Sequence, residues 1–112
     1  MHTITDDYSI LCTQTGHATL KGIMRLPSPA DYTQPFKYLF NYIEDHNGPF
    51  TIDISELQEL NSSGLTALAR IFIMARQVEV PIVVLGNQNS YWQRKSMSSL
   101  QKLWSEIVVK LS

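Results

Sequence analysis

The sequence contains very little cysteine, few charged residues and no long hydrophobic run. Its 112 residues include one cysteine, Cys12, so no internal disulfide can form and no thiolate cluster can bind zinc. No apolar stretch approaches the roughly eighteen residues that span a bilayer. The N-terminal segment carries Asp6 and Asp7 and lacks the basic start of a signal peptide. We therefore expect a cytoplasmic protein in a reducing compartment without a membrane span.

Sequence signals of catalysis and of metal binding are also missing. His2, His17 and His46 are far apart, and none is paired with a second ligand at metal-binding spacing. The five glycines form no phosphate-binding loop, and there is no Gly-x-Ser-x-Gly elbow. The acidic residues form no clear acid–base pair. We therefore expect no catalytic residue, no metal and no cofactor, and we interpret the protein as a non-enzyme.

The charges almost balance, with a formal net charge of −1 and a pI near 6.3. No overall basic field would attract nucleic acid or an anionic membrane. One small basic and aromatic patch is present, comprising Tyr91, Trp92, Arg94, Lys95 and Lys102. Such charges usually solvate the outer face of a helix, so we expect no nucleic-acid partner.

What is present is the composition of one folded domain over residues 1–112, with 44% hydrophobic and 17% charged residues. Tyr8–Gln14 and His17–Leu26 have the pattern of two strands, and the polar turn Thr15-Gly16 between them predicts a hairpin. A proline-rich passage then interrupts the sheet. Phe36, Leu39, Phe40 and Ile43 form a helical stripe, which 46–49 would end with a glycine and a proline.

The second half of the chain alternates between strands and helices. The strands are expected at Phe50–Ile54, at 81–85 and at 107–111, and the helices at Asn61–Val78 and Tyr91–Trp104. The order β-β-α-β-α-β-α-β predicts an α/β fold with a mixed sheet and helices packed on it. The apolar segments FTIDI and PIVVL should lie side by side and parallel, and the second should be covered on both faces.

One short pattern carries functional information: Asp53-Ile54-Ser55, followed by Asn61-Ser62-Ser63-Gly64-Leu65. Hydroxyl residues at a helix start have a structural role as caps, worth about 1 kcal/mol. The stretch TIDISELQELNSSGLTALARIF, however, resembles the signature of STAS domains. In that family an Asp-aliphatic-Ser strand end precedes a helix that starts Asp-Ser-Ser-Gly-Leu or Asp-Ser-Thr-Gly-Leu. The order of elements agrees over nearly the whole chain.

The resemblance implies an anti-sigma-factor antagonist, in which a partner kinase phosphorylates the serine after the Asp. That position is Ser62, with Ser63 as the alternative. The implied partners are a serine-kinase-type ATPase that is also the anti-sigma factor, and a PP2C-type phosphatase. Asn61 departs from the family pattern, because many members carry Asp there, and this bears on recognition by a kinase. The alternative function is a non-phosphorylated STAS scaffold or ligand-sensing module.

A docking surface for the partner is expected around this motif. We assign it to the loop Ser55–Gly64, where Gly64 would allow close approach of a partner backbone. Ile73 extends the surface, because it shares its helix side with polar residues, although broad burial of that helix is the simpler explanation of its apolar run. The expected docking residues are Asp53, Ser55, Asn61, Ser63, Gly64 and Ile73.

Overall fold

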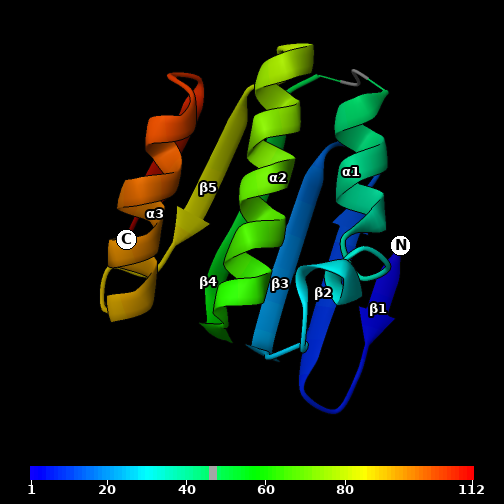
Figure 1. Ribbon diagram of the computed structural model, residues 1–112, viewed down its shortest axis with the longest axis vertical. Helices are drawn as coiled ribbons and strands as arrows, with labels where there is room; N and C mark the ends of the chain where they lie inside the picture. The colour runs from blue at the N-terminus through cyan, green and yellow to red at the C-terminus, as the bar shows by residue number, and fades with distance from the viewer. Residues whose placement is uncertain (46–47) are drawn as a thin grey trace.

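The computed structural model describes residues 1–45 and 48–112, which form one sheet with helices packed on one face (Figure 1). The strands are β1 (His2–Ile4), β2 (Tyr8–Thr13), β3 (His17–Met24), β4 (Phe50–Leu60), β5 (Ile82–Gly86) and β6 (Ile107–Leu111). The helices are α1 (Lys37–Glu44), α2 (Ser62–Val78) and α3 (Tyr91–Leu100), and the 3-10 turns are η1 (Pro29–Tyr32) and η2 (Gln101–Leu103). The predicted α/β class with a mixed sheet is confirmed.

The strands lie in the sheet in the order in which they occur along the chain. β1, β2 and β3 are antiparallel neighbours, whereas β3 to β6 are parallel. A helix connects each successive pair of parallel strands, as parallel strands require. The predicted pairing of the two apolar segments is confirmed, since Ile52 of β4 lies opposite Val84 of β5.

One strand was missed and two predicted boundaries were wrong. β1 was missed because three residues are too few to show a pattern, and pairing with β2 holds them in place. The third helix was predicted to reach Trp104 but ends at Leu100, because the chain tightens into η2 and becomes extended at Trp104. The predicted strand Phe50–Ile54 continues to Leu60. The residues expected to end the first helix include 46 and 47, which lie outside the described residues.

The core lies between the sheet and the helices. Alternate strand residues and one side of α2 fill it, including Ile52, Ile54, Leu68 and Phe72, each at most 1% exposed. The prediction that β5 is covered on both faces was wrong: Val83 and Leu85 alternate with its buried residues and are only half-buried. They lie on the face of the sheet that carries no helix.

The buried side of α3 is short. The enclosed side chains of this helix are Gln93 and Met97, whereas Leu100, Leu103 and Trp104 are only half-buried. These three residues lie at the end of α3, in η2 and directly after it, beyond the segment that packs closely on the sheet.

Two irregularities in β4 allow it to be long. Thr19 of β3 pairs with Asp53, but Lys21 pairs with Glu56, so β4 gains one residue there. A second extra residue follows, and the buried positions of β4 then fall three residues apart, at Ile54, Leu57 and Leu60. Such bulges re-aim side chains beside a functional edge. They explain why an alternating pattern was not visible in SELQEL.

Candidate functional site

Asn61 joins three parts of the chain at the start of α2. Its Oδ1 accepts a hydrogen bond from the Gly64 N–H at 3.0 Å, which caps the helix, and another from the Tyr32 hydroxyl at 2.7 Å. Its Nδ2 donates to the Leu26 carbonyl at 2.9 Å, while the Leu26 N–H donates to the Tyr32 hydroxyl at 3.3 Å. Burial raises the pKa of Tyr32, so the hydroxyl remains protonated and able to donate.

This network accounts for the departure of Asn61 from the STAS pattern. An aspartate could accept the two hydrogen bonds at Oδ1, but it has no N–H to donate to the Leu26 carbonyl. The amide therefore performs two tasks that a carboxylate could not perform together.

The two serines of the motif have different environments. Ser62 is the first residue of α2 and is exposed, and no hydrogen bond joins its hydroxyl to another residue in the described ranges. The Ser63 hydroxyl donates to the Pro27 carbonyl at 3.4 Å, which ties it to the segment between β3 and η1. Of these two hydroxyls, only that of Ser62 lacks a hydrogen bond to the residues that the structure describes.

Gly64 is required by packing within the domain. A Cβ built on this buried residue would lie 2.3 Å from Leu60 Cδ1 and 2.8 Å from Tyr32 Cζ. The close approach inferred from the sequence is therefore explained by packing against Leu60 and Tyr32. Any larger side chain at this position must displace core atoms, so we expect substitution of Gly64 to lower stability, and its role in docking stays a prediction.

The expected docking loop Ser55–Gly64 does not exist as a loop, since residues up to Leu60 belong to β4. Asp53 and Ser55 lie on the face of the sheet without helices, where the Asp53 carboxylate stabilises the first bulge. Asp53 Oδ1 accepts from the Ser55 N–H at 2.9 Å and from the Ser55 hydroxyl at 2.7 Å. The Asp-Ile-Ser triplet thus has a local structural role in shaping β4.

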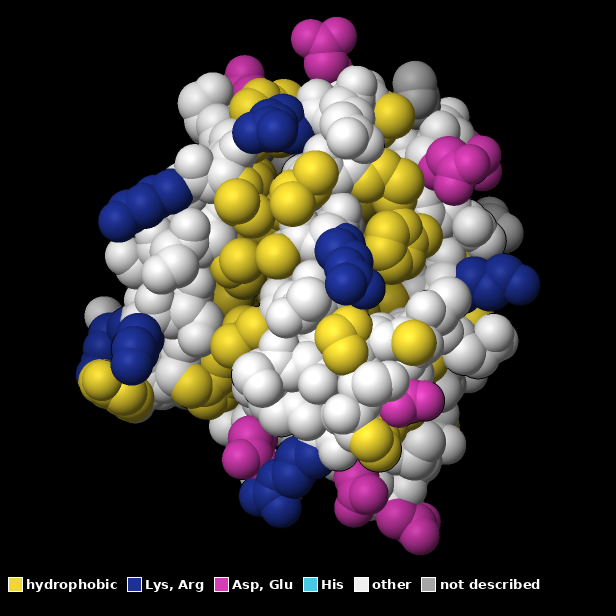
Figure 2. Space-filling model, viewed as in Figure 1, with side chains coloured by type: hydrophobic (Ala, Val, Ile, Leu, Met, Phe, Trp, Pro, Cys, Tyr) yellow, Lys and Arg dark blue, Asp and Glu magenta, His cyan; other side chains and the backbone are white. Residues whose placement is uncertain are grey.

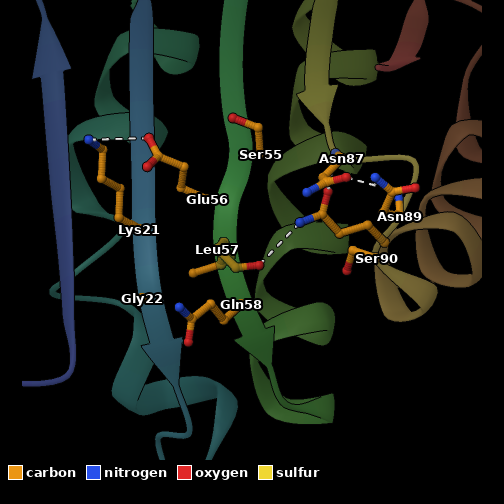
Figure 3. A pocket seen from close by; sticks show the side chains of 10 residues that line it. Lys21, Gly22, Ser55, Glu56, Leu57, Gln58, Asn87, Asn89 and Ser90 are labelled. Atoms are coloured by element: carbon orange, nitrogen blue, oxygen red, sulfur yellow. Dashed lines mark hydrogen bonds and ion pairs between the residues drawn. The ribbon is translucent and has the colours of Figure 1, made fainter.

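A hollow of about 590 Å³ lies beside this bulge, between β4 and the segment that joins β5 to α3 (Figure 3). Hydrogen-bonding side chains dominate its lining, including Ser55, Gln58, Asn87 and Asn89. The ion pair Lys21–Glu56, with 3.3 Å between Nζ and Oε2, stands at its side toward β3. The hollow forms because β5 ends at Gly86 while β4 continues.

Gln93 fills the position that a longer β5 would occupy. It is 1% exposed, and its Nε2 donates to the carbonyls of Ile54 at 2.7 Å and Leu57 at 3.1 Å. Its Oε1 accepts from the Asn87 N–H at 2.7 Å. Sequence reasoning missed this residue. A lone glutamine among charged neighbours on a helix gives no signal, because its partners are backbone groups far along the chain.

Ile73 is half-buried on α2, and Arg70 and Gln77 on the same side are exposed, so the predicted partial exposure is confirmed. The structure thus divides the predicted docking residues into two groups. Asn61, Ser63, Gly64 and Ile73 belong to α2 and its cap, whereas Asp53 and Ser55 lie on the opposite face of the sheet. Within the described residues, no helix has the length and hydropathy to cross a membrane.

Comparison with known proteins gives a match in structure and none in sequence. No family model matches the chain, and no curated protein matches it. Among solved structures, a chain in the crystal structure of diguanylate cyclase SiaD in complex with its activator SiaC from Pseudomonas aeruginosa matches with a TM-score of 0.74. The match covers 100% of this chain and 99% of that chain at 16% sequence identity.

The matched chain is the activator SiaC. At this sequence identity the similarity concerns the fold alone. The mixed sheet with three helices on it is compatible with a STAS-like fold.

Proposed function

We propose that the protein is a non-enzymatic regulator that binds a protein partner, and that phosphorylation of Ser62 controls the binding. The observation that carries this proposal is that Ser62, the first residue of α2, is exposed and that its hydroxyl makes no hydrogen bond to any described residue. The fold supports it as well, because SiaC shares this fold and activates an enzyme with which it forms a complex.

The start of α2 is suited to a phosphate. The first turn contains no acidic residue, and the capping residue Asn61 is neutral. A phosphoserine, with a charge of about −2, would therefore interact favourably with the helix macrodipole and with the N–H groups of the first turn. We expect the modified protein to keep its fold.

The phosphate that the helix start accommodates would be unfavourable for a bound partner. A partner surface that fits the bare hydroxyl would meet a bulky dianion after phosphorylation and would be repelled or displaced. Ser62 is favoured over Ser63 as the acceptor, because the Ser63 hydroxyl is bonded to the Pro27 carbonyl and less accessible to a kinase.

The specific form that we propose is partner switching in the cytoplasm, as in anti-sigma-factor antagonists. The partners would be a serine-kinase-type ATPase that acts as the anti-sigma factor, and a PP2C-type phosphatase that restores Ser62. The match to SiaC, the activator of a diguanylate cyclase, adds a second kind of target, namely an enzyme that the protein would activate by binding.

The second candidate function is a non-phosphorylated scaffold or ligand-sensing module. The polar hollow of about 590 Å³ beside β4 favours it, because its volume and its hydrogen-bonding lining suit a small polar molecule. Intact-mass analysis of the protein from its host separates the two functions: phosphate on Ser62 supports the first, and its absence under all growth conditions supports the second.

The decisive experiment compares partner binding by Ser62→Ala, Ser62→Glu and wild type, with a partner isolated from the host and then purified. Ser62→Ala should bind constitutively, whereas Ser62→Glu should lose about tenfold in affinity, which is about 1.4 kcal/mol. Stability should change by less than about 1 kcal/mol in both variants. Ser112→Glu, at an exposed serine after β6, is the control for added charge. Wild-type binding by both Ser62 variants would show that this serine is not the switch.

A further inference from the structure

The charges of this protein are separated along the chain. Residues 1–60 contain eight acidic residues and three Lys or Arg, whereas residues 61–105 contain one acidic residue, Glu79, and five Lys or Arg. The near-neutral net charge conceals this asymmetry. The five cations lie on α2, α3 and η2, and all are exposed: Arg70, Arg76, Arg94, Lys95 and Lys102.

These cations are not neutralised within the domain. The ion pairs in the described part of the chain join Lys21 of β3 to Glu56 of β4, and Arg25, the residue after β3, to Glu59 of β4. Arg76 donates to the Leu103 carbonyl and Arg94 to the Gln88 carbonyl, which orients the guanidinium groups but leaves their charge uncompensated. The outer face of α2 and α3 is therefore positively charged.

An apolar groove runs through this positive face. It has a volume of about 240 Å³ and is lined by Leu65 of α2 and by Lys95, Ser96, Ser99 and Leu100 of α3. Figure 2 shows hydrophobic side chains along the seam between the two helices, with Lys and Arg side chains on both sides. Leu65 and Leu100 are half-buried, so each retains apolar surface for a partner.

We propose that this groove is the docking site for an acidic amphipathic helix of the protein partner. The inference rests on the proposed function, because it identifies the surface by which the regulator would bind. A helix suits a groove between two helices, whose side chains it can meet ridge into groove. Its apolar side would cover Leu65 and Leu100, and its acidic side would face Lys95 and the other cations.

The groove also gives the switch a physical mechanism. Ser62 lies one helical turn before Leu65, so a phosphate on Ser62 would stand at the end of the groove. Its charge of about −2 would reduce the positive potential that attracts an acidic helix. Nucleic acid is a poorer fit than an acidic helix, because a phosphate backbone makes no use of an apolar groove.

The test uses the full chain, labelled with ¹⁵N, and three probes. The first is a stapled acidic amphipathic peptide of about four turns, the second is the same peptide with each Glu replaced by Lys, and the third is a single-stranded oligonucleotide. We expect the acidic peptide to shift the amide signals of Leu65, Lys95 and Leu100, and to bind at least about tenfold more tightly than its basic twin.

Variants locate the contact. Lys95→Glu and Leu100→Ala should each weaken binding of the acidic peptide, and Lys95→Glu should lower its affinity by about tenfold. Lys110→Glu makes the same charge change on β6, at a position facing away from the helices, and should leave binding unchanged. Three results would overturn the proposal. The basic twin could bind as tightly as the acidic peptide, the signal shifts could be confined to other surfaces, or the oligonucleotide could bind these residues in preference to the peptide. Self-association through the groove would overturn it too.

The same titration with Ser62→Glu separates this inference from the proposed function. We expect this variant to bind the acidic peptide more weakly than wild type. If the peptide binds in the groove and Ser62→Glu binds it as tightly as wild type, the docking site is supported and the switch is refuted. Loss of native-partner binding by Ser62→Glu, with no peptide contact at the groove, would retain the switch and refute the docking site.

Discussion

The Tyr32 hydroxyl lies 2.7 Å from Asn61 Oδ1, and this hydrogen bond connects the η1 turn to the residue that caps α2. The same asparagine holds the Leu26 carbonyl through its Nδ2. The end of β3, the η1 turn and the start of α2 are therefore fixed relative to one another. Ser62, the residue after Asn61, therefore starts α2 from a position that these hydrogen bonds fix.

Asn61→Asp, which restores the residue common in the STAS pattern, should destabilise this protein. The variant keeps the cap on Gly64 but places a carboxylate oxygen against the Leu26 carbonyl without a proton between them. We expect the free energy of unfolding to fall by about 1–2 kcal/mol, as measured by urea denaturation. Tyr32→Phe is the companion variant and should also lower stability. An Asn61→Asp protein as stable as wild type would show that the Nδ2 hydrogen bond contributes nothing.

Gly64→Ala should lower stability although alanine favours helices by about 1 kcal/mol over glycine. The added Cβ collides with Leu60 and the Tyr32 ring, and overpacking of this kind costs about 1–3 kcal/mol. Truncating Leu60 to Ala removes the nearest colliding atoms. The cost of Gly64→Ala should therefore be smaller in a Leu60→Ala background, which a double-mutant cycle by denaturation measures. Identical costs in both backgrounds would contradict the packing explanation.

Gln93→Leu should be strongly destabilising despite its similar size. The substitution leaves the carbonyls of Ile54 and Leu57 and the N–H of Asn87 without their partner, and such buried groups cost about 1–3 kcal/mol each. Hydrogen exchange at Asn87 should become faster. Gln101→Leu is the matched control, because Gln101 is exposed in η2. The stability of this variant protein should stay close to that of wild type. A Gln93→Leu protein of normal stability would mean that water replaces the amide at no cost.

The stability of the protein should fall as the pH rises from 9 toward 11. Burial raises the pKa of the Cys12 thiol from 9.0 to about 11, so in this window the unfolded chain loses the thiol proton while the folded chain keeps it. Because the folded state then binds more protons, the free energy of unfolding decreases with pH, by on the order of 2 kcal/mol. Cys12→Ala should lack this part of the decline. Parallel pH profiles of wild type and variant would contradict the burial of the thiol.

Much of the fold follows from local patterns. The two strands of the hairpin, the second helix and the apolar run at 81–85 have patterns that depend only on neighbouring residues, and all were found near their predicted positions. β1 and the second half of β4 were not predicted, because each of these segments owes its strand conformation to pairing with a neighbouring strand. β1 pairs with β2, and the segment after Ile54 pairs with β3 through two bulges.

The candidate site shows the same division. The sequence alone was sufficient to place Asn61, Ser62 and Ser63 at the start of a helix, because capping chemistry is local. Only the tertiary structure decided that Ser63 is tethered and Ser62 is not, and that Gly64 is packed against Tyr32, thirty-two positions before it in the numbering. Likewise, Leu65 and Lys95 are thirty positions apart in the chain, and they line one groove only because α2 and α3 pack side by side. Hydrogen-bond partners, clashes and surface potential are set by residues distant in sequence, so no pattern of neighbouring residues contains them.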